Sequence, residues 1–189
     1  LISKLPVGIV LNSIHKGDEN DTAVILFTSG SEKDPKAVQL THRNISSNIE
    51  NFGTYENITE SDVILANLVF FHVFGLTVNL WVSFYYGMTM VCYANPLDFA
   101  TVSKIAREEK PTVMVGTPSF FWGYLHKSEP GDFKSLRLMV SGADKCPDAL
   151  REGFMKKHGV TLMEGYGATE TSPVISANSQ EYNRPGSTG

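Results

Sequence analysis

Short runs of apolar residues alternate with amphipathic segments along most of this chain. Continuous apolar runs predict strands that are covered on both faces, and six of them occupy residues 23–27, 63–68, 88–93, 112–115, 136–140 and 160–163. Apolar positions at helical spacing predict helices between them, at residues 41–52, 74–86, from 98 to at least 106, 117–125 and 147–157. Thr41, Asp98 and the pair Thr117-Pro118 are suitable first residues for three of these helices.

Strands that alternate with helices of this length predict parallel βαβ units with right-handed crossovers. The expected fold class is α/β, with layered, mostly parallel sheets flanked by helices. Ligands bind beyond the carboxyl ends of the strands in such sheets. The segments to inspect for chemistry are therefore residues 28–36, 69–74, 116–118, 141–143 and 164–170.

Composition and charge narrow the class of protein. The chain has 189 residues, is 42% hydrophobic and carries a net charge of −4, so one globular domain is expected and nucleic acid is not an expected partner. Cys92 and Cys146 lack metal-binding spacing and are interpreted as reduced structural thiols. We expect residues 1–20 to be a leading segment and residues 21–189 to be part of a domain cut from a longer protein.

The stretch between Asp62 and Asp98 contains no charged residue and could be taken for a membrane span, which needs roughly 20 apolar residues. Polar residues and glycines interrupt it, and a strand-like run follows at once. A buried strand–helix–strand is therefore favoured over a transmembrane helix, and a surface that docks on lipid is the remaining alternative.

A polar loop at residues 28–36 follows the first apolar run and is suited to an anion. It contains hydroxyl residues, Gly30 and two lysines, and main-chain N–H groups, hydroxyls and a lysine together can surround a phosphate. A Walker A loop needs Gly-Lys followed by Ser or Thr. Here Pro35-Lys36-Ala37 follows Gly30 instead, which excludes that class. The structural alternative is an ordinary polar turn.

A second loop, at residues 164–170, follows the last apolar run with the sequence Glu-Gly-Tyr-Gly-Ala-Thr-Glu. Two glycines allow the backbone to bend around Tyr166, whose ring can stack on a flat heterocycle. Thr169 can bond a phosphate oxygen, and Glu170 is an oxygen ligand suited to Mg²⁺. The alternative is a turn with a solvated glutamate.

Together the two loops resemble those of the adenylate-forming superfamily, which comprises acyl-CoA synthetases, firefly luciferase and peptide-synthetase adenylation domains. Three further stretches resemble that family in the same order: Phe70-Phe71-His72-Val73-Phe74-Gly75, Gly116-Thr117-Pro118 and Ser141-Gly142-Ala143. In detail the motifs look most like the synthetase half of the bifunctional acyl-[acyl-carrier-protein] synthetase/2-acylglycerophosphoethanolamine acyltransferases. Few motifs separate that subfamily from the long-chain acyl-CoA ligases.

The resemblance implies a fatty-acid-activating ligase that uses ATP and Mg²⁺. A fatty carboxylate would attack the α-phosphate of ATP, and the thiol of acyl carrier protein or CoA would then take the acyl group, feeding lysophospholipid reacylation. Groups that stabilise the negative transition state would be the main catalytic device. The resemblance also implies a cytoplasmic-face location and inner-membrane association of the full-length protein.

The resemblance assigns residues to each part of the nucleotide. The β- and γ-phosphates would be held by Thr28, Ser29, Gly30, Ser31 and Lys36. The adenine and α-phosphate would be held by Gly142, Ala143, Glu164, Gly165, Tyr166, Gly167 and Thr169. The catalytic set would be His72, Lys36, Thr169 and Glu170, with Glu170 as the Mg²⁺ ligand and His72 near the acyl carboxylate. A buried core histidine is the alternative for His72. Apolar residues that could line an acyl tunnel, or belong to the core, are Phe70, Phe74, Trp81, Phe120, Phe121 and Trp122.

Two positions depart from the family pattern, because Lys33 and Ala37 stand where glycine is usual. Glycine reaches backbone angles that cost other residues roughly 1–2 kcal/mol, so the loop could close less readily over phosphate, or Lys33 could add a contact. The family's ribose-binding aspartate, C-terminal lid domain and acyltransferase domain are not found in the sequence. We expect that these 189 residues alone do not form acyl-AMP. A non-catalytic nucleotide-binding module and a membrane-anchored interaction domain are the rival hypotheses.

Overall fold

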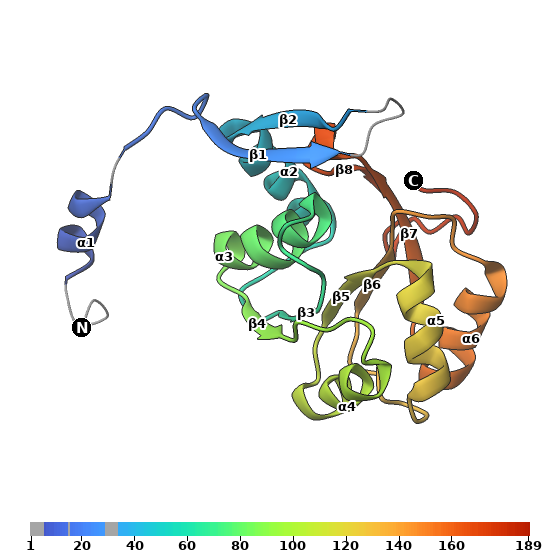
Figure 1. Ribbon diagram of the computed structural model, residues 1–189. Coiled ribbons are helices and arrows are strands. Elements are labelled where there is room, and N and C mark those ends of the chain that lie inside the picture. Colours follow the sequence, from blue (N-terminus) through green and yellow to red (C-terminus); the bar gives the residue numbers. More distant parts are fainter. Residues whose placement is uncertain (1–5, 15, 29–33) are drawn as a thin grey trace.

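A six-stranded sheet forms the centre of the molecule in the computed structural model, which describes residues 6–14, 16–28 and 34–189 (Figure 1). The strand order is β4-β3-β5-β6-β7-β8. The first five strands run parallel, and β8 is antiparallel to β7. Their bounds are β3 Val63–Ala66, β4 Thr89–Cys92, β5 Val113–Gly116, β6 Leu138–Ser141, β7 Leu162–Gly167 and β8 Val174–Ala177. The expected α/β fold with a mostly parallel sheet is confirmed.

Helices cover both faces of this sheet (Figure 1). One face carries α2 (His42–Tyr55), the π-helix Gly75–Trp81 and α3 (Val82–Tyr86), and the other carries α4 (Phe99–Glu109), α5 (Pro118–Lys127) and α6 (Asp148–His158). The remaining helices are α1 (Val7–Ser13) and the short 3-10 helix Thr169–Thr171.

Side chains of the central strands alternate between the two faces, as the period of a strand requires. In β5, Val113 and Val115 belong to the core beneath α2, whereas Met114 belongs to the core beneath α4, α5 and α6. Both sets are fully buried, because each face has its own helices. This explains why the strands read as continuous apolar runs in the sequence.

The three predicted helix starts are confirmed. Thr41 and Asn44 form a reciprocal capping box at α2, in which the Thr41 side chain accepts from the Asn44 N–H at 3.1 Å. Asp98 caps α4, accepting from the Thr101 N–H at 3.2 Å, and Thr117 caps α5, which has a proline in its first turn. Each cap satisfies an N–H group that the helix itself cannot pair.

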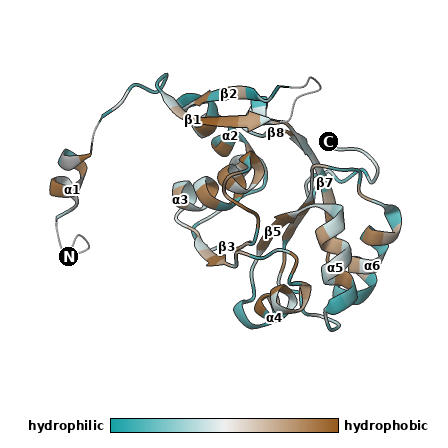
Figure 2. Ribbon diagram, viewed as in Figure 1, coloured by the Kyte–Doolittle hydropathy of each residue, from teal (hydrophilic) through white to brown (hydrophobic). Residues whose placement is uncertain are grey.

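Residues 23–27 form a strand as predicted, but the prediction that both faces of this strand are covered is wrong. They lie in β1 (Thr22–Thr28), which pairs antiparallel with β2 (Lys36–Thr41) in a separate two-stranded sheet. Only one side of β1 packs on the core, so Ile25 is 54% exposed and Phe27 73% exposed. Figure 2 makes the same point, because β1 is hydrophobic although it lies at the edge of the molecule. The sequence reasoning also missed β2, α1 and β8.

The uncharged stretch between Asp62 and Asp98 folds as β3, the π-helix, α3 and β4. Thr77, Asn79 and Ser83 are buried within it. Among the described residues no helix has the length and apolarity that a membrane crossing needs. The two cysteines are free thiols, Cys146 buried and Cys92 exposed.

Candidate active site

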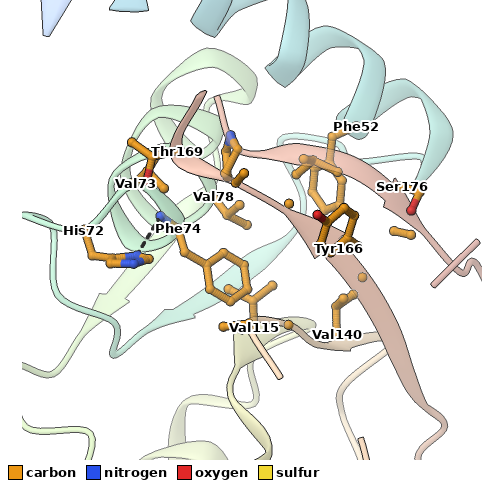
Figure 3. Close-up of a pocket in the computed structure, with 18 residues that line it drawn as sticks. Phe52, His72, Val73, Phe74, Val78, Val115, Val140, Tyr166, Thr169 and Ser176 are labelled. Atoms are coloured by element: carbon orange, nitrogen blue, oxygen red, sulfur yellow. Dashed lines mark hydrogen bonds between the residues drawn. The ribbon is translucent and has the colours of Figure 1, made fainter. Parts of the chain in front are cut away.

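A pocket of about 240 Å³ lies at the carboxyl ends of β5, β6 and β7, between the π-helix and β8 (Figure 3). Complete small-molecule sites usually measure roughly 300–1,000 Å³, so this pocket suits a flat ring system rather than an entire nucleotide. Three of the five segments predicted from strand ends contribute to it, namely 69–74, 141–143 and 164–170. The sequence-predicted residues that line it are His72, Gly142, Ala143, Gly165, Tyr166, Gly167 and Thr169.

The floor of the pocket is apolar. Val115 and Val140 reach it from β5 and β6, and Phe74 and Val78 reach it from the helical side (Figure 3). Gly142 leaves little room for a side chain at this wall, because a Cβ there would lie 3.2 Å from the Phe74 ring, a tight contact. The absence of a side chain at position 142 therefore keeps a flat surface and an accessible backbone beside the pocket.

Ala143 stands out in the backbone. Its φ angle is 68°, in the left-handed region, where a non-glycine residue is disfavoured by roughly 1–2 kcal/mol. Strained backbone of this kind concentrates at functional sites, where the surrounding structure holds it. The strain here turns the chain sharply just after β6 and places residues 142 and 143 along the wall.

Tyr166 lies at the opposite wall and is 56% exposed. Its ring faces the pocket from the end of β7 (Figure 3). The pairing of β7 with β8 shifts register between Tyr166 and Gly167, and such irregularities re-aim side chains at the ends of strands. The ring is therefore free to stack on a heterocycle placed over the apolar floor.

Thr169 and Glu170 lie on the 3-10 helix that follows β7. Thr169 lines the pocket, whereas Glu170 is exposed beside it. No group of three or more potential metal ligands occurs among residues 6–14, 16–28 and 34–189. A single carboxylate is nevertheless suited to Mg²⁺ when a nucleotide supplies further oxygen ligands, since Mg²⁺ commonly binds through one or two carboxylates and substrate phosphates.

His72 is exposed at the rim of the pocket, so the core-histidine alternative is wrong. Its Nδ1 accepts a hydrogen bond from the Phe74 N–H at 3.2 Å (Figure 3). An accepting Nδ1 carries no proton, so the neutral ring has its proton on Nε2. His72 can therefore offer a hydrogen-bond donor to an anionic group in the pocket.

Among the residues predicted to hold the adenine and the α-phosphate, Glu164 is the one that does not line the pocket. It is buried, with one oxygen accepting from the Cys146 N–H at 3.2 Å and the other from Arg151 at 2.7 Å and the Gly186 N–H at 2.9 Å. These bonds join β7 to α6, to the loop before α6 and to the segment at Gly186. They support the wall from behind, whereas direct contact with a nucleotide stays a prediction for the Glu164 side chain.

The first predicted loop is described only at its ends. Thr28 and Lys36 pair with each other across β1 and β2, so the loop is closed by a hairpin rather than leading directly into a helix as expected. Neither residue lines the pocket. Ser29, Gly30, Ser31 and Lys33 lie outside the described residues. Ala37 is in regular β2 pairing with Phe27, and it is absent from the positive-φ residues, so in this structure the position does not need glycine's freedom.

Of the aromatic residues considered for an acyl tunnel, only Phe74 lines this pocket. Phe121 is fully buried in the core beneath α4, α5 and α6, and Phe120 and Trp122 pack against it. Sequence reasoning missed the contribution of β8, from which Val174, Ser176 and Ala177 complete the wall. The short apolar segment at 174–177 was the available signal.

An apolar slot with an exposed aromatic ring and a threonine, at the carboxyl edge of a parallel sheet, lies where α/β domains bind their ligands. The AMP-binding enzyme family matches residues 7–189. The chain therefore belongs to that family, the adenylate-forming superfamily, whose members use ATP and Mg²⁺.

Known proteins agree with this membership. A long-chain-fatty-acid–CoA ligase of Bacillus subtilis is 36% identical over 176 residues, which are 90% of this chain and 31% of that protein. ATP-bound MatB from Rhodopseudomonas palustris is 28% identical with a TM-score of 0.82, over 93% of this chain and 35% of that one. The O-succinylbenzoate coenzyme A synthetase of B. subtilis, in complex with ATP and magnesium, is 29% identical with a TM-score of 0.81. The match covers 91% of this chain and 36% of that one. The chain thus spans about a third of the length of these relatives.

Proposed function

We propose that this chain forms the nucleotide- and acid-binding part of an ATP-dependent acid–thiol ligase. The observation that carries the proposal is the meeting of Tyr166, Thr169, His72 and the Gly142-Ala143 wall around one pocket, although these residues come from three separate strand ends. The long-chain-fatty-acid–CoA ligase of B. subtilis, at 36% identity, supports a fatty acid as the substrate.

In the first half-reaction, a carboxylate oxygen of the acid forms a bond to the α-phosphorus of ATP, and the bond to pyrophosphate breaks. Tyr166 and the flat wall at Gly142 hold the adenine between them. Thr169 donates to an α-phosphate oxygen, and the His72 Nε2–H orients the acid carboxylate. Glu170 would hold Mg²⁺, which would supply positive charge beside the phosphates. Preorganised donors and charge of this kind are what a reaction between two anions requires.

In the second half-reaction, a thiolate attacks the acyl carbon, the new C–S bond forms, and AMP leaves with the oxygen. The names of the relatives favour CoA as the thiol. The motif resemblance supports a finer proposal, in which acyl carrier protein is the thiol that accepts the acyl group. The acyl group would then serve lysophospholipid reacylation, and the full-length protein would lie at the cytoplasmic face of a membrane. Offering both thiols to the acyl-adenylate and measuring which thioester forms decides between them.

The proposal is tested with the protein in its full natural chain, by ATP–pyrophosphate exchange in the presence of fatty acids of increasing length. Exchange that depends on the acid is expected, and Glu170→Ala and Thr169→Ala should each lower it by about 10²-fold or more, because each removes a group that stabilises transition-state charge. Glu152→Ala is the matched control, since Glu152 is an exposed carboxylate on α6.

Binding of ATP without any exchange would contradict the ligase proposal. It would favour the second candidate, a nucleotide-binding module without catalysis, for which the lysine at position 33, where glycine is usual in the family, is the motivating observation.

A further inference from the structure

Asn48 joins two segments that are more than 120 residues apart in the sequence. It lies on α2, and its side-chain Nδ2 donates to the Thr171 carbonyl at 3.1 Å and to the Val174 carbonyl at 2.8 Å. Its Oδ1 accepts from the Val174 N–H at 3.2 Å. One amide therefore makes three hydrogen bonds to the turn that follows Thr169 and Glu170.

The turn itself is closed by its own bonds. The Ala168 N–H donates to the Pro173 carbonyl at 3.0 Å, and the Thr171 N–H donates to the Ala168 carbonyl at 3.1 Å. Such a turn keeps its shape, and β7 and β8 hold its two ends at the edge of the sheet. The Asn48 amide adds hydrogen bonds from the turn to α2, and its three partners lie at both ends of the segment 171–174.

The other side of Asn48 leads to the first loop. Lys36 begins β2, β2 ends at Thr41, and Thr41 caps α2 through the reciprocal bonds with Asn44. β2 also packs against the 3-10 helix that carries Thr169 and Glu170. The chain from Lys36 to Asn48 is thus one continuous, capped strand–helix unit, so a bond from Asn48 fixes that unit relative to the Thr169–Glu170 turn.

We propose that Asn48 is a positioning residue, which holds the Thr169–Glu170 turn at a fixed place relative to the strand that begins at Lys36, the lysine that the family resemblance assigns to the phosphates, so that both parts act on one nucleotide. This inference rests on the proposed function for its effect on ATP. Asn48 itself does not line the pocket, so it acts through the turn and not by touching the ligand.

The test uses the full natural chain and compares Asn48→Ala and Asn48→Asp with Asn51→Ala. Asn51 is the matched control, since it is an exposed asparagine on the same helix, three positions further on. Asn48→Ala should raise the KM for ATP by roughly tenfold or more, because each hydrogen bond is typically equivalent to about a fivefold change. The KM for the fatty acid should stay within about twofold of the wild type, a split that general loss of structure would not give.

Asn48→Asp is the sharper variant. It keeps an acceptor for the Val174 N–H but turns a carboxylate oxygen toward two carbonyl oxygens. The KM for ATP should therefore rise at least as much in Asn48→Asp as in Asn48→Ala. A KM for ATP within twofold of the wild type in both variants would overturn the inference. So would unfolding of both variants under assay conditions, because Asn48 would then be required for the fold itself.

A second readout does not depend on activity. Hydrogen exchange at the Val174 amide and its neighbours should become at least about tenfold faster in Asn48→Ala than in Asn51→Ala, since the bond that protects it is removed. If the wild-type protein shows no ATP–pyrophosphate exchange, the proposed function fails, but amide hydrogen exchange still tests whether Asn48 holds the turn. Unchanged hydrogen exchange at residues 171–174 in Asn48→Ala would contradict the role of Asn48.

Discussion

Gly167 is required by a neighbouring carbonyl group rather than by its own backbone angles. A Cβ at this position would collide with the Pro173 carbonyl oxygen, which is the acceptor for the Ala168 N–H at 3.0 Å. The Pro173 carbonyl of the turn between β7 and β8 therefore lies directly against the Gly167 backbone. Tyr166 and Thr169, on either side of Gly167, depend on this close contact for their place at the pocket.

Gly167→Ala tests this dependence. The added methyl group has only backbone atoms to displace, so we expect a loss of about 1–3 kcal/mol in the free energy of unfolding together with weaker binding of ATP. Gly8→Ala is the control, because no atom lies within 4 Å of a Cβ at Gly8. Urea unfolding of both variants is the measurement, and equal stability of the two would contradict the explanation.

The elements around the site are held together by a buried ion pair between β7 and α6. Arg151 of α6 lies 2.7 Å from Glu164, and both side chains are largely buried. Glu164 also accepts from two backbone N–H groups, and Arg151 donates to the Cys146 carbonyl at 2.9 Å. Burial raises the pKa of the neighbouring Cys146 thiol, against the opposing charge of Arg151.

Breaking this pair should be costly, since the remaining charge is left buried without its partner. We expect Arg151→Met to lower the free energy of unfolding by about 3–5 kcal/mol. The double variant Arg151→Met with Glu164→Gln should lose less than the sum of the two single variants. Denaturant unfolding of all three proteins measures this coupling, and strict additivity would show that the pair is not coupled.

The sequence predicted elements well where a strand is buried on both faces and poorly where it is not. β3, β5, β6 and the first residues of β7 belong to continuous apolar runs because helices cover both sides. The run in β1 looks the same, yet Ile25 and Phe27 face outward, and composition does not distinguish these cases. β2 alternates instead, with Val38 and Leu40 inward and Gln39 outward, a pattern that would have revealed a half-covered strand.

The site was predictable to the extent that it lies at strand ends. Glycines and polar residues after β6 and β7 marked the pocket walls, because parallel strands deliver their carboxyl ends to one edge. The direction of the Glu164 side chain was not predictable, since it depends on Arg151 and Gly186 arriving from other parts of the chain. The Asn48 connection likewise requires three-dimensional proximity.

At the scale of the whole molecule, two buried groups, Glu56 and His158, make the free energy of unfolding depend on pH in opposite directions. Burial raises the pKa of Glu56 to about 7, against the opposing charge of Arg137. Burial, helped by Lys157, lowers the pKa of His158 to about 4. Stability from Glu56 is therefore full below its ordinary pKa of 4.5 and is lost as pH rises through about 7. Stability from His158 is full above 6.5 and is lost as pH falls through about 4.

Single variants should separate these two slopes. Between pH 4.5 and 7, we expect the free energy of unfolding to rise with pH in Glu56→Gln, where His158 remains, and to fall with pH in His158→Gln, where Glu56 remains. Each change should amount to about 1–2 kcal/mol. Urea unfolding across this range is the measurement, with Glu60→Gln as the exposed control. Slopes of the same sign in both variants would contradict the assignment.

The placement of β8 has a consequence for synthesis on the ribosome. The pocket draws its lining from Phe52 through Ala177, and its last wall is a strand that pairs antiparallel with β7. Chains emerge from the amino terminus first, so the floor formed by Val115, Val140 and Phe74 is made before the strand that completes the wall beside it. A nascent chain that pauses before residue 174 carries an open apolar groove, and that interval is when a chaperone would have most to bind.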